Sequence, residues 1–207
     1  MDSLRKLEEH FAKFPGIGPR QAKRFVYYLL NKSPSSIKEL TQLIEEVRHS
    51  TSQCVQCYRF FTAHTGTKAS HHCSICSDTS RDGETLMIVA RDSDFETVEK
   101  SGAYKGLYFI LGGTVPILDK EPEKRIRLEK LLEHVTQKKS PLREVILSLN
   151  ATPDGEHTAT IVREAIQKVT KNQSNLKITI LGRGLSTGAE LEYVDGETIK
   201  NALQNRH

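Results

Sequence analysis

Four short apolar runs in the second half of the chain alternate with helical patterns. The runs lie at residues 86–90, 107–111, 144–149 and 177–181. The helical patterns lie between them, at residues 94–101, 123–138 and 156–170. Apolar strands that alternate with helices are typical of βαβ units. The sequence therefore predicts an α/β domain with a mostly parallel sheet over residues 81–181.

Three helices are predicted in a separate region, residues 1–50. The first covers residues 4–11, the second begins at Pro19, and the third covers residues 37–47 after a Ser-Pro-Ser-Ser cap. Proline suits the first turn of a helix, which supports Pro19 as the start of the second helix. The apolar side chains of the third helix, Leu40, Leu43 and Ile44, are expected to face inward.

The C-terminal segment, residues 182–207, is predicted to contain a short strand, an Asp-Gly turn and a final helix. No apolar run approaches the roughly 20 residues that a membrane-spanning helix needs. The N-terminus lacks the apolar stretch of a signal peptide. We therefore expect a cytoplasmic protein without a membrane partner.

Four cysteines define a third region, residues 51–80. Cys54, Cys57, Cys73 and Cys76 have the spacing C-x2-C-x15-C-x2-C, which is typical of a four-cysteine zinc site. The segment has few large aliphatic residues, so metal binding would replace the missing core. A closed set of four ligands leaves no position for water. The pattern predicts one structural Zn²⁺ per chain.

Three other interpretations of the cysteines remain open, and the simplest is that the four cysteines occur at this spacing by chance. They could form redox-active C-x-x-C pairs, although neither pair has the strand and helix that a thioredoxin-type motif requires. One of three nearby histidines, His64, His71 and His72, could also replace a cysteine as a ligand.

The segment Phe14–Arg24 has the pattern of a helix-hairpin-helix. Gly16 and Gly18 would let the hairpin backbone approach a phosphate, and the amides at the start of the next helix would donate to it. Arg20, Lys23 and Arg24 would add salt-dependent contacts. Five basic residues and no acidic residue occur between Phe11 and Ser33. The pattern predicts DNA binding that reads no base sequence, and the alternative is an ordinary helical corner.

Acidic residues cluster after two of the predicted strands. Asp92 and Asp94 follow the first strand, and Asp154 and Glu156 follow the third. Such positions can hold Mg²⁺ in open α/β folds, so a Mg²⁺-dependent enzyme is one alternative. However, Ala90 and Asn150 stand where such an enzyme would need carboxylates. Asp94 and Glu156 would equally suit the N-terminal ends of helices.

The order of these regions resembles the RecR family of bacterial recombination mediators over essentially the whole chain. The residues that carry the resemblance are Phe14–Pro19, the four cysteines, Asn150–Glu156 with Thr158, and Gly184–Asp195 with Thr198. The resemblance implies a Toprim-like domain at residues 81–181 and an oligomerisation segment at residues 182–207.

The resemblance also implies a function. RecR-like proteins are not enzymes, form rings that are commonly tetramers, and help RecO- and RecF-type partners load recombinase at gapped or broken DNA. By motif, Arg20 and Arg24 would contact single- and double-stranded DNA. We therefore expect a homotetramer or homodimer at the bacterial nucleoid. A protein-interaction adaptor that does not bind DNA is a further alternative.

The chain departs from the family after the first predicted strand. The family has a Glu where Ala90 stands, and that Glu and an Asp four residues later are implicated in partner contact. Only the second acid remains, as Asp94, which the resemblance marks as the partner-binding residue. Ser186, which replaces a common Pro, and the loop at residues 112–122 are also unusual.

Overall fold

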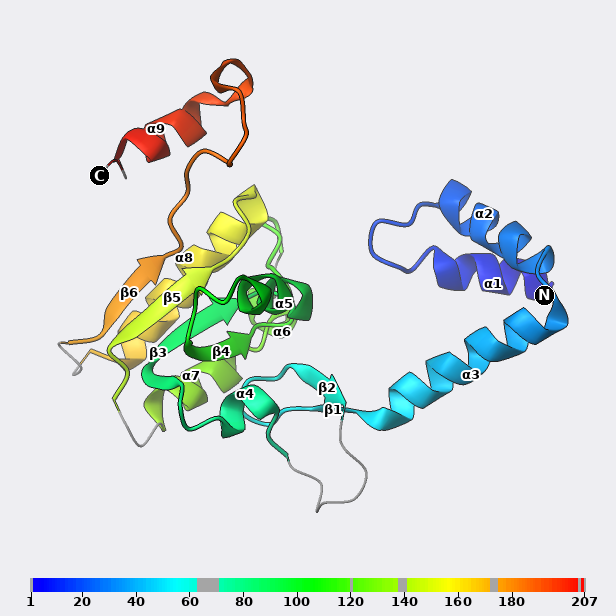
Figure 1. The fold of residues 1–207 in the computed structure, drawn as a ribbon, viewed down its shortest axis with the longest axis horizontal. Coiled ribbons are helices and arrows are strands. Elements are labelled where there is room, and N and C mark those ends of the chain that lie inside the picture. The colour runs from blue at the N-terminus through cyan, green and yellow to red at the C-terminus, as the bar shows by residue number, and fades with distance from the viewer. Residues whose placement is uncertain are drawn as a thin grey trace. The chain divides into compact units, whose positions relative to one another are not determined.

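The computed structural model describes residues 2–62, 71–119, 121–137, 141–171, 175–204 and 206. His64 and most of the loop between the cysteine pairs lie outside these residues. The chain divides into two compact units, whose elements are labelled in Figure 1. One unit contains Met1–Thr51 with Thr62–His64, and the other contains Ser52–Phe61 with Thr65–His207.

The first unit contains the three predicted helices. They are α1 (Ser3–Phe11), α2 (Pro19–Leu30) and α3 (Pro34–Ser50). The side chain of Asp2 caps α1 by accepting from the Leu4 N–H at 3.2 Å. Ser33 caps α3 by accepting from the Ser36 N–H at 3.3 Å. These caps satisfy backbone donors that have no partner within a helix.

A small aromatic core holds α1 against α2. Phe11 packs edge-to-face on Phe14 and Phe25, with ring centroids 5.6 and 5.8 Å apart. Ala22 and Val26 of α2 are fully buried. The prediction for α3 is wrong, because the side chains of Leu40, Leu43 and Ile44 are exposed. Helical spacing predicts which side chains of α3 share an apolar face, but it does not predict whether another element packs against that face.

The second unit is built on a four-stranded parallel sheet, which confirms the predicted α/β class. Its strands are β3 (Asp82–Val89), β4 (Gly106–Ile110), β5 (Glu144–Ser148) and β6 (Lys177–Ile180). They are ordered β4-β3-β5-β6, and each neighbouring pair is parallel. The strand order places β3 and β5 in the centre, where both are paired on two sides.

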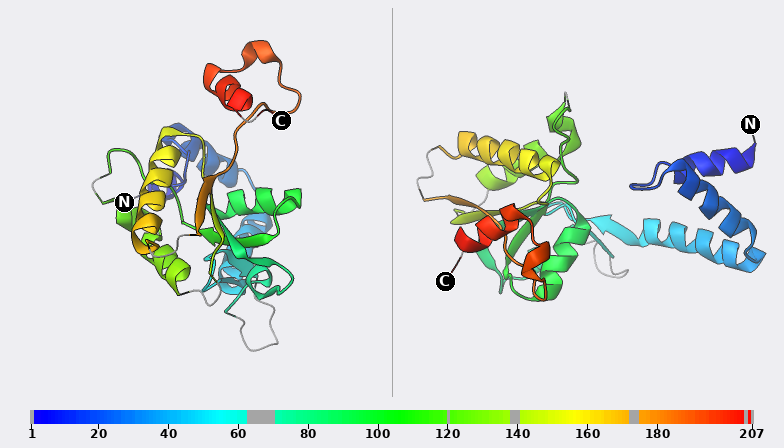
Figure 2. Two further views of the ribbon diagram at one scale, coloured as in Figure 1. Left: turned by 90° about the vertical axis from the view of Figure 1, so that its left-hand side faces the viewer. Right: turned by 90° about the horizontal axis from the view of Figure 1, so that it is seen from above.

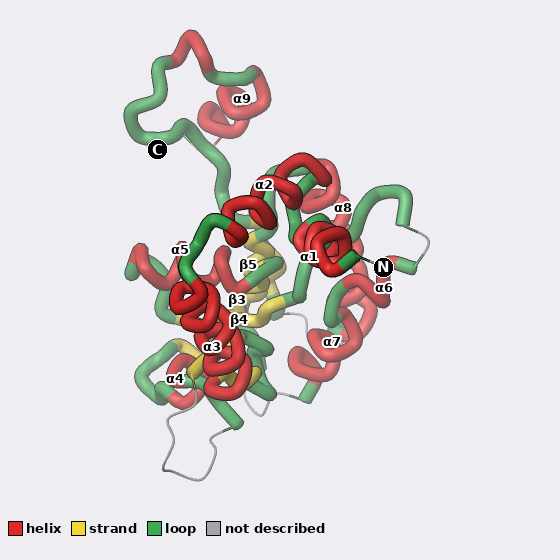
Figure 3. Tube along the Cα trace, turned by 90° about the vertical axis from the view of Figure 1, so that its right-hand side faces the viewer, coloured by secondary structure: helices red, strands yellow, loops and turns green. Residues whose placement is uncertain are grey.

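Helices cover both faces of this sheet, as Figures 2 and 3 show. α7 (Leu128–Thr136) and α8 (Pro153–Val169) pack against Leu86 and Ile88 of β3. α5 (Asp92–Ser101) packs on the other face, against Met87 and Val89. The alternate side chains of one strand therefore enter two separate cores.

The predicted helix at residues 123–138 is interrupted. α6 (Pro122–Arg125) ends at Arg125, and α7 begins at Leu128 after the two intervening residues Ile126 and Arg127. At the break, the Arg127 N–H donates to the Leu111 carbonyl at 2.8 Å instead of to a carbonyl of its own helix. A long-range hydrogen bond to the loop after β4 thus overrides the helical pattern.

The prediction of a short strand in the C-terminal segment is also wrong. Leu191–Tyr193 forms a 3-10 turn, and the Tyr193 N–H donates locally to the Glu190 carbonyl at 3.1 Å. The Asp-Gly pair does not make a hairpin. Asp195 caps the final helix, α9 (Gly196–Gln204), by accepting from the Glu197 and Thr198 N–H groups.

The cysteine segment contributes only short elements. β1 (Thr51–Gln53) pairs with β2 (Phe60–Thr62), and α4 (Ser74–Ser77) carries one cysteine. Among the described residues, no helix is both long and apolar enough to cross a bilayer.

Candidate functional site

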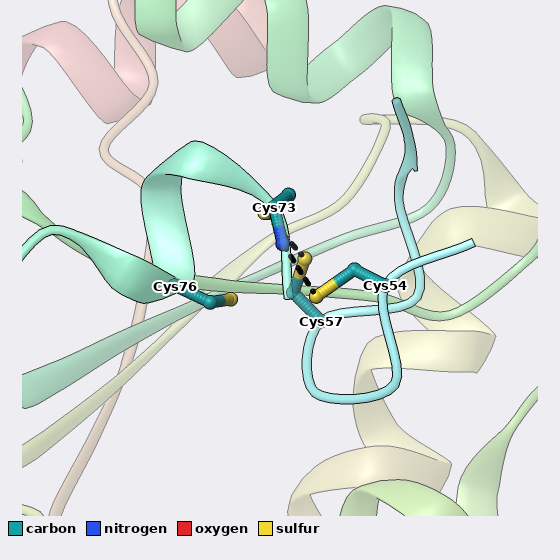
Figure 4. Close-up of side chains that lie close together, drawn as sticks. All are labelled: Cys54, Cys57, Cys73 and Cys76. Atoms are coloured by element: carbon teal, nitrogen blue, oxygen red, sulfur yellow. Dashed lines mark hydrogen bonds between the residues drawn. The ribbon is translucent and has the colours of Figure 1, made fainter. Parts of the chain in front are cut away.

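The four cysteine sulfur atoms converge on one point. Cys54 and Cys57 lie in the turn after β1, Cys73 precedes α4, and Cys76 lies within it, as Figure 4 shows. All four Sγ atoms lie within 4.8 Å of one another, and those of Cys57 and Cys73 are 3.6 Å apart. Tetrahedral zinc with Zn–S bonds of about 2.3 Å would place sulfur atoms about 3.8 Å apart. The cluster therefore has the size and ligand chemistry of a four-thiolate metal site.

Hydrogen bonds and one left-handed residue define the backbone of the first C-x-x-C turn. The Tyr58 N–H donates to the Cys54 carbonyl at 2.9 Å, and the Cys73 N–H points at the Cys54 Sγ at 3.4 Å. Tyr58 has φ of 64°, the only positive φ of a non-glycine residue in the described chain. This left-handed residue reverses the chain directly after the second ligand.

The thiols strongly perturb one another. The pKa of Cys54 is lowered because the thiols of Cys57, Cys73 and Cys76 hydrogen-bond to its sulfur. Hydrogen bonds with the other three cysteines, together with burial, raise the pKa of Cys76. Four thiolates this close would repel one another, so the cluster shares protons unequally. A divalent cation at the centre would offset that repulsion and favour deprotonation of all four.

The cluster is part of the core of the second unit. Cys54, Cys57 and Cys73 are buried with Met87, Val89 and other side chains on the α5 face of the sheet. The guanidinium of Arg59 stacks over the Phe95 ring of α5, 4.5 Å from its centroid. The cysteine segment therefore completes the layer that α5 begins.

The hairpin between α1 and α2 has an open backbone. Gly16 has φ of 75°, which explains the need for glycine at that position. Gly18 is the N-cap of α2 with φ of −84°, so its conformation does not require glycine. A Cβ added at either glycine would meet nothing within 4 Å. The space beside Gly18 is what a closely approaching phosphate would require.

The cations of α2 lie on its exposed side. Arg20, Lys23 and Arg24 are exposed, and Arg24 donates only to the neighbouring Gln21 carboxamide at 3.3 Å. None of the ion pairs among the described residues involves these three side chains. Their charges are therefore not offset by a carboxylate of the same unit.

The acidic residues after the strands do not converge. Asp92 accepts from the Phe60 N–H at 2.9 Å, and Asp94 accepts from the Arg91 N–H at 3.0 Å. Asp154 accepts from the Ile117 N–H at 3.3 Å, and Glu156 pairs with Arg183 at 2.7 Å. Within the described residues, only the cysteine cluster brings three or more potential metal ligands together.

Comparison with known proteins gives three family matches in the predicted order. Residues 4–48 match the RecR helix-hairpin-helix, residues 63–181 match the Toprim domain, and residues 184–207 match the RecR C-terminal region. Recombination protein RecR of Chloroflexus aurantiacus (strain ATCC 29366 / DSM 635 / J-10-fl) is 34% identical over 201 residues, which is 97% of this chain and 92% of that protein. Its counterpart from Prochlorococcus marinus (strain MIT 9312) is 32% identical over 203 residues, which is 98% and 94% of the two chains. The chain belongs to the RecR family.

Two features of this RecR-family chain were not found from its sequence. The strained Tyr58 could have been suspected from its place directly after the second cysteine of a C-x-x-C turn. Tyr27 and Tyr28 lie exposed on α2 beyond the three cations. Their spacing of three and four residues from Arg24 is the signal that could have placed them on its face.

Proposed function

We propose that this chain is a non-enzymatic mediator of recombinational repair that binds DNA without reading its sequence. The observation that carries the proposal is the open hairpin at Gly16 and Gly18, followed by a helix that exposes Arg20, Lys23 and Arg24. Backbone amides at a helix start and nearby cations are the groups that bind phosphates. Membership in a family of recombination proteins supports the same role.

DNA binding is tested with a double substitution and a matched control. Arg20→Ala with Arg24→Ala should weaken binding of single and double strands. The log–log salt slope should flatten by about 0.9 for each duplex phosphate that the protein no longer neutralises. Lys38→Ala with Arg48→Ala removes the same charge from α3 in the same unit. Equal affinity and slope in both double variants would contradict the role of the hairpin.

The absence of catalysis is supported by the strand-end carboxylates. Asp92, Asp94, Asp154 and Glu156 each have an intramolecular partner, and Ala90 supplies no ligand. A Mg²⁺-dependent Toprim enzyme would need several of these carboxylates directed at one ion. Incubation of DNA with the purified protein and Mg²⁺ tests this, and cleavage that disappears in Glu156→Gln would overturn the proposal.

The cysteine cluster is proposed to hold one structural Zn²⁺. Four thiolates suit zinc, and a complete set of four protein ligands would leave no open position for water or substrate. When bound, the ion would supply cross-linking and charge neutralisation rather than chemistry on a substrate. Metal analysis should give about one zinc per chain. An iron–sulfur absorption spectrum would contradict zinc.

We further propose a ring of two or four chains that works with RecO- and RecF-type proteins in the bacterial cytoplasm, at the nucleoid. Residues 182–207 would supply one subunit contact, and Asp94 would contact the RecO-type partner. Asp94→Asn keeps an acceptor for the Arg91 N–H but removes the charge. Weaker partner binding with unchanged native mass would support Asp94, and unchanged binding would exclude it.

A further inference from the structure

The outward face of α2 combines cations with exposed aromatic rings. Tyr27 is 48% exposed and Tyr28 is 60% exposed, although both belong to a helix that packs in a small unit. Exposed apolar surface that is bordered by charged residues is a feature of binding surfaces, and cations lie beside both tyrosines. The five residues of this face, Arg20, Lys23, Arg24, Tyr27 and Tyr28, are called the α2 face below.

Helical geometry places these five side chains together. Ala22 and Val26 are buried, so the opposite side of α2 faces outward. Arg20, Arg24 and Tyr28 form a row at intervals of four residues. Side chains three and four residues apart are neighbours on a helix surface. Tyr27 and Tyr28 therefore continue the row of cations by one turn, away from the hairpin.

Two lysines already pack against the tyrosine rings. The Lys32 Nζ lies 4.4 Å from the Tyr28 ring centroid, and the Lys23 Nζ lies 5.9 Å from that of Tyr27. These contacts place positive charge beside each π face. A ligand that offers both phosphates and flat rings would satisfy the cations and the tyrosines together.

We infer that Tyr27 and Tyr28 form a base-stacking site that gives the α2 face a preference for single-stranded DNA. The inference rests on the proposed DNA-binding function and deepens it. Arg20, Lys23 and Arg24 would hold the phosphates, and the next nucleotides would stack on the rings about 14 Å from Gly18. A duplex keeps its bases stacked inside, so it engages the cations and leaves the tyrosines unused.

Charge argues against a second copy of the same face as the occupant. A two-fold symmetric contact would place the patch against itself. Arg20, Lys23 and Arg24 would then face identical cations, and no acidic residue lies between Phe11 and Ser33 to separate them. Like charges brought together across an interface are unfavourable. DNA complements both the charge and the rings.

The test compares two double variants on three labelled probes. Tyr27→Leu with Tyr28→Leu removes the rings, and Tyr27→Phe with Tyr28→Phe retains them without the hydroxyls. The probes are an oligo-dT strand, an abasic strand of equal length, and a hairpin duplex. Fluorescence anisotropy at several salt concentrations gives the affinity and the salt slope, while thermal melting confirms that each variant is folded.

The leucine variant should bind oligo-dT roughly tenfold to a hundredfold more weakly than the wild type. Its duplex affinity should change less than about twofold, and its salt slope should not change, because the phosphate contacts remain. The phenylalanine variant should retain tight oligo-dT binding. The wild-type protein should bind the abasic strand about as weakly as the leucine variant binds oligo-dT.

Three results would overturn the inference. One is unchanged oligo-dT binding by the leucine variant, while Arg20→Ala with Arg24→Ala still weakens binding; DNA binding would then stand without stacking. Another is equal weakening of both strand types with a flattened slope. A third is a changed native mass in the leucine variant alone, which would assign the face to a subunit contact. Failure of the wild-type protein to bind any probe would overturn the proposed function as well.

Discussion

The carbonyl oxygen of Cys57 accepts a hydrogen bond from the backbone N–H of Ile110, at 2.9 Å. Ile110 ends β4, which is an edge strand of the parallel sheet. A cysteine of the four-thiol cluster is thus joined directly to the backbone of the sheet, at the edge that no further strand extends within the described residues. The cysteine turn protects this edge and belongs to the same compact unit as the sheet.

Metal removal should therefore destabilise the whole second unit. Cys54→Ser, or treatment with a strong chelator, is expected to lower the free energy of unfolding by several kcal/mol. Each kcal/mol lost should lower the melting temperature by about 2–4 °C. Calorimetry with parallel zinc analysis measures this. DNA binding should fall only as the protein unfolds. A well-folded Cys54→Ser protein that selectively fails to bind DNA would contradict a purely structural role.

The two hairpin glycines should respond differently to alanine. Gly16→Ala places a Cβ on a residue with φ of 75°, so it should cost about 1 kcal/mol of stability. Gly18→Ala has an ordinary φ and open space, so it should leave the melting temperature nearly unchanged. Its methyl group would lie where the phosphate approaches and should weaken DNA binding. Normal DNA affinity in Gly18→Ala would argue against close phosphate contact.

Glu99 should be important for stability because it neutralises a buried cation. The Arg81 side chain is only 9% exposed; it pairs with Glu99 and donates to the Gly106 carbonyl at 3.0 Å. Glu99→Gln leaves the half-exposed Asp78, whose carboxylate lies 3.8 Å from the Arg81 Nε, as the remaining countercharge, so it should cost about 1–3 kcal/mol. Chemical denaturation measures this change in stability. Glu96→Gln, an exposed change on the same helix, should have almost no effect.

Stability should fall at alkaline pH. Burial and the hydrogen bond that its hydroxyl donates to Glu99 raise the pKa of Tyr108, and burial raises the pKa of Tyr104 to about 12. A raised folded-state pKa stabilises the protein fully below the unfolded value of about 10, and this stabilisation disappears as the pH rises beyond it. Melting temperatures should stay level up to about pH 9 and decline between about pH 10 and 12, and Tyr108→Phe should reduce this decline. An identical pH profile in the variant would contradict the assignment.

Two substitutions of Tyr58 should separate the energetic effect of its left-handed backbone from that of its side-chain packing. Its ring packs on Phe109, with centroids 5.3 Å apart, and beneath the guanidinium of Arg127 at 5.5 Å. Tyr58→Ala removes this packing and keeps the left-handed strain, whereas Tyr58→Gly removes the packing and relieves the strain. The glycine variant should be about 1 kcal/mol more stable than the alanine variant. Denaturation midpoints of the two proteins test this, and the reverse order would show that the strain is negligible.

The sequence by itself determined the features that depend on local spacing. Alternating apolar runs predicted the parallel strands, and proline and serine marked the starts of α2 and α3. The pairs Cys54–Cys57 and Cys73–Cys76 predicted the sulfur cluster. Each signal is contained within a few residues or repeats with a fixed period, so it can be detected without knowledge of distant contacts.

Only the tertiary structure decided which partners these elements meet. It interrupted the helix at Arg127 with a hydrogen bond to Leu111, and it left the apolar face of α3 uncovered. It also bound the strand-end acid Asp92 to the Phe60 N–H, 32 residues away. Such contacts join residues far apart in the chain, and the choice between possible partners depends on the whole packed arrangement. Local pattern therefore predicted the cysteine cluster, whereas only packing joined it to the sheet.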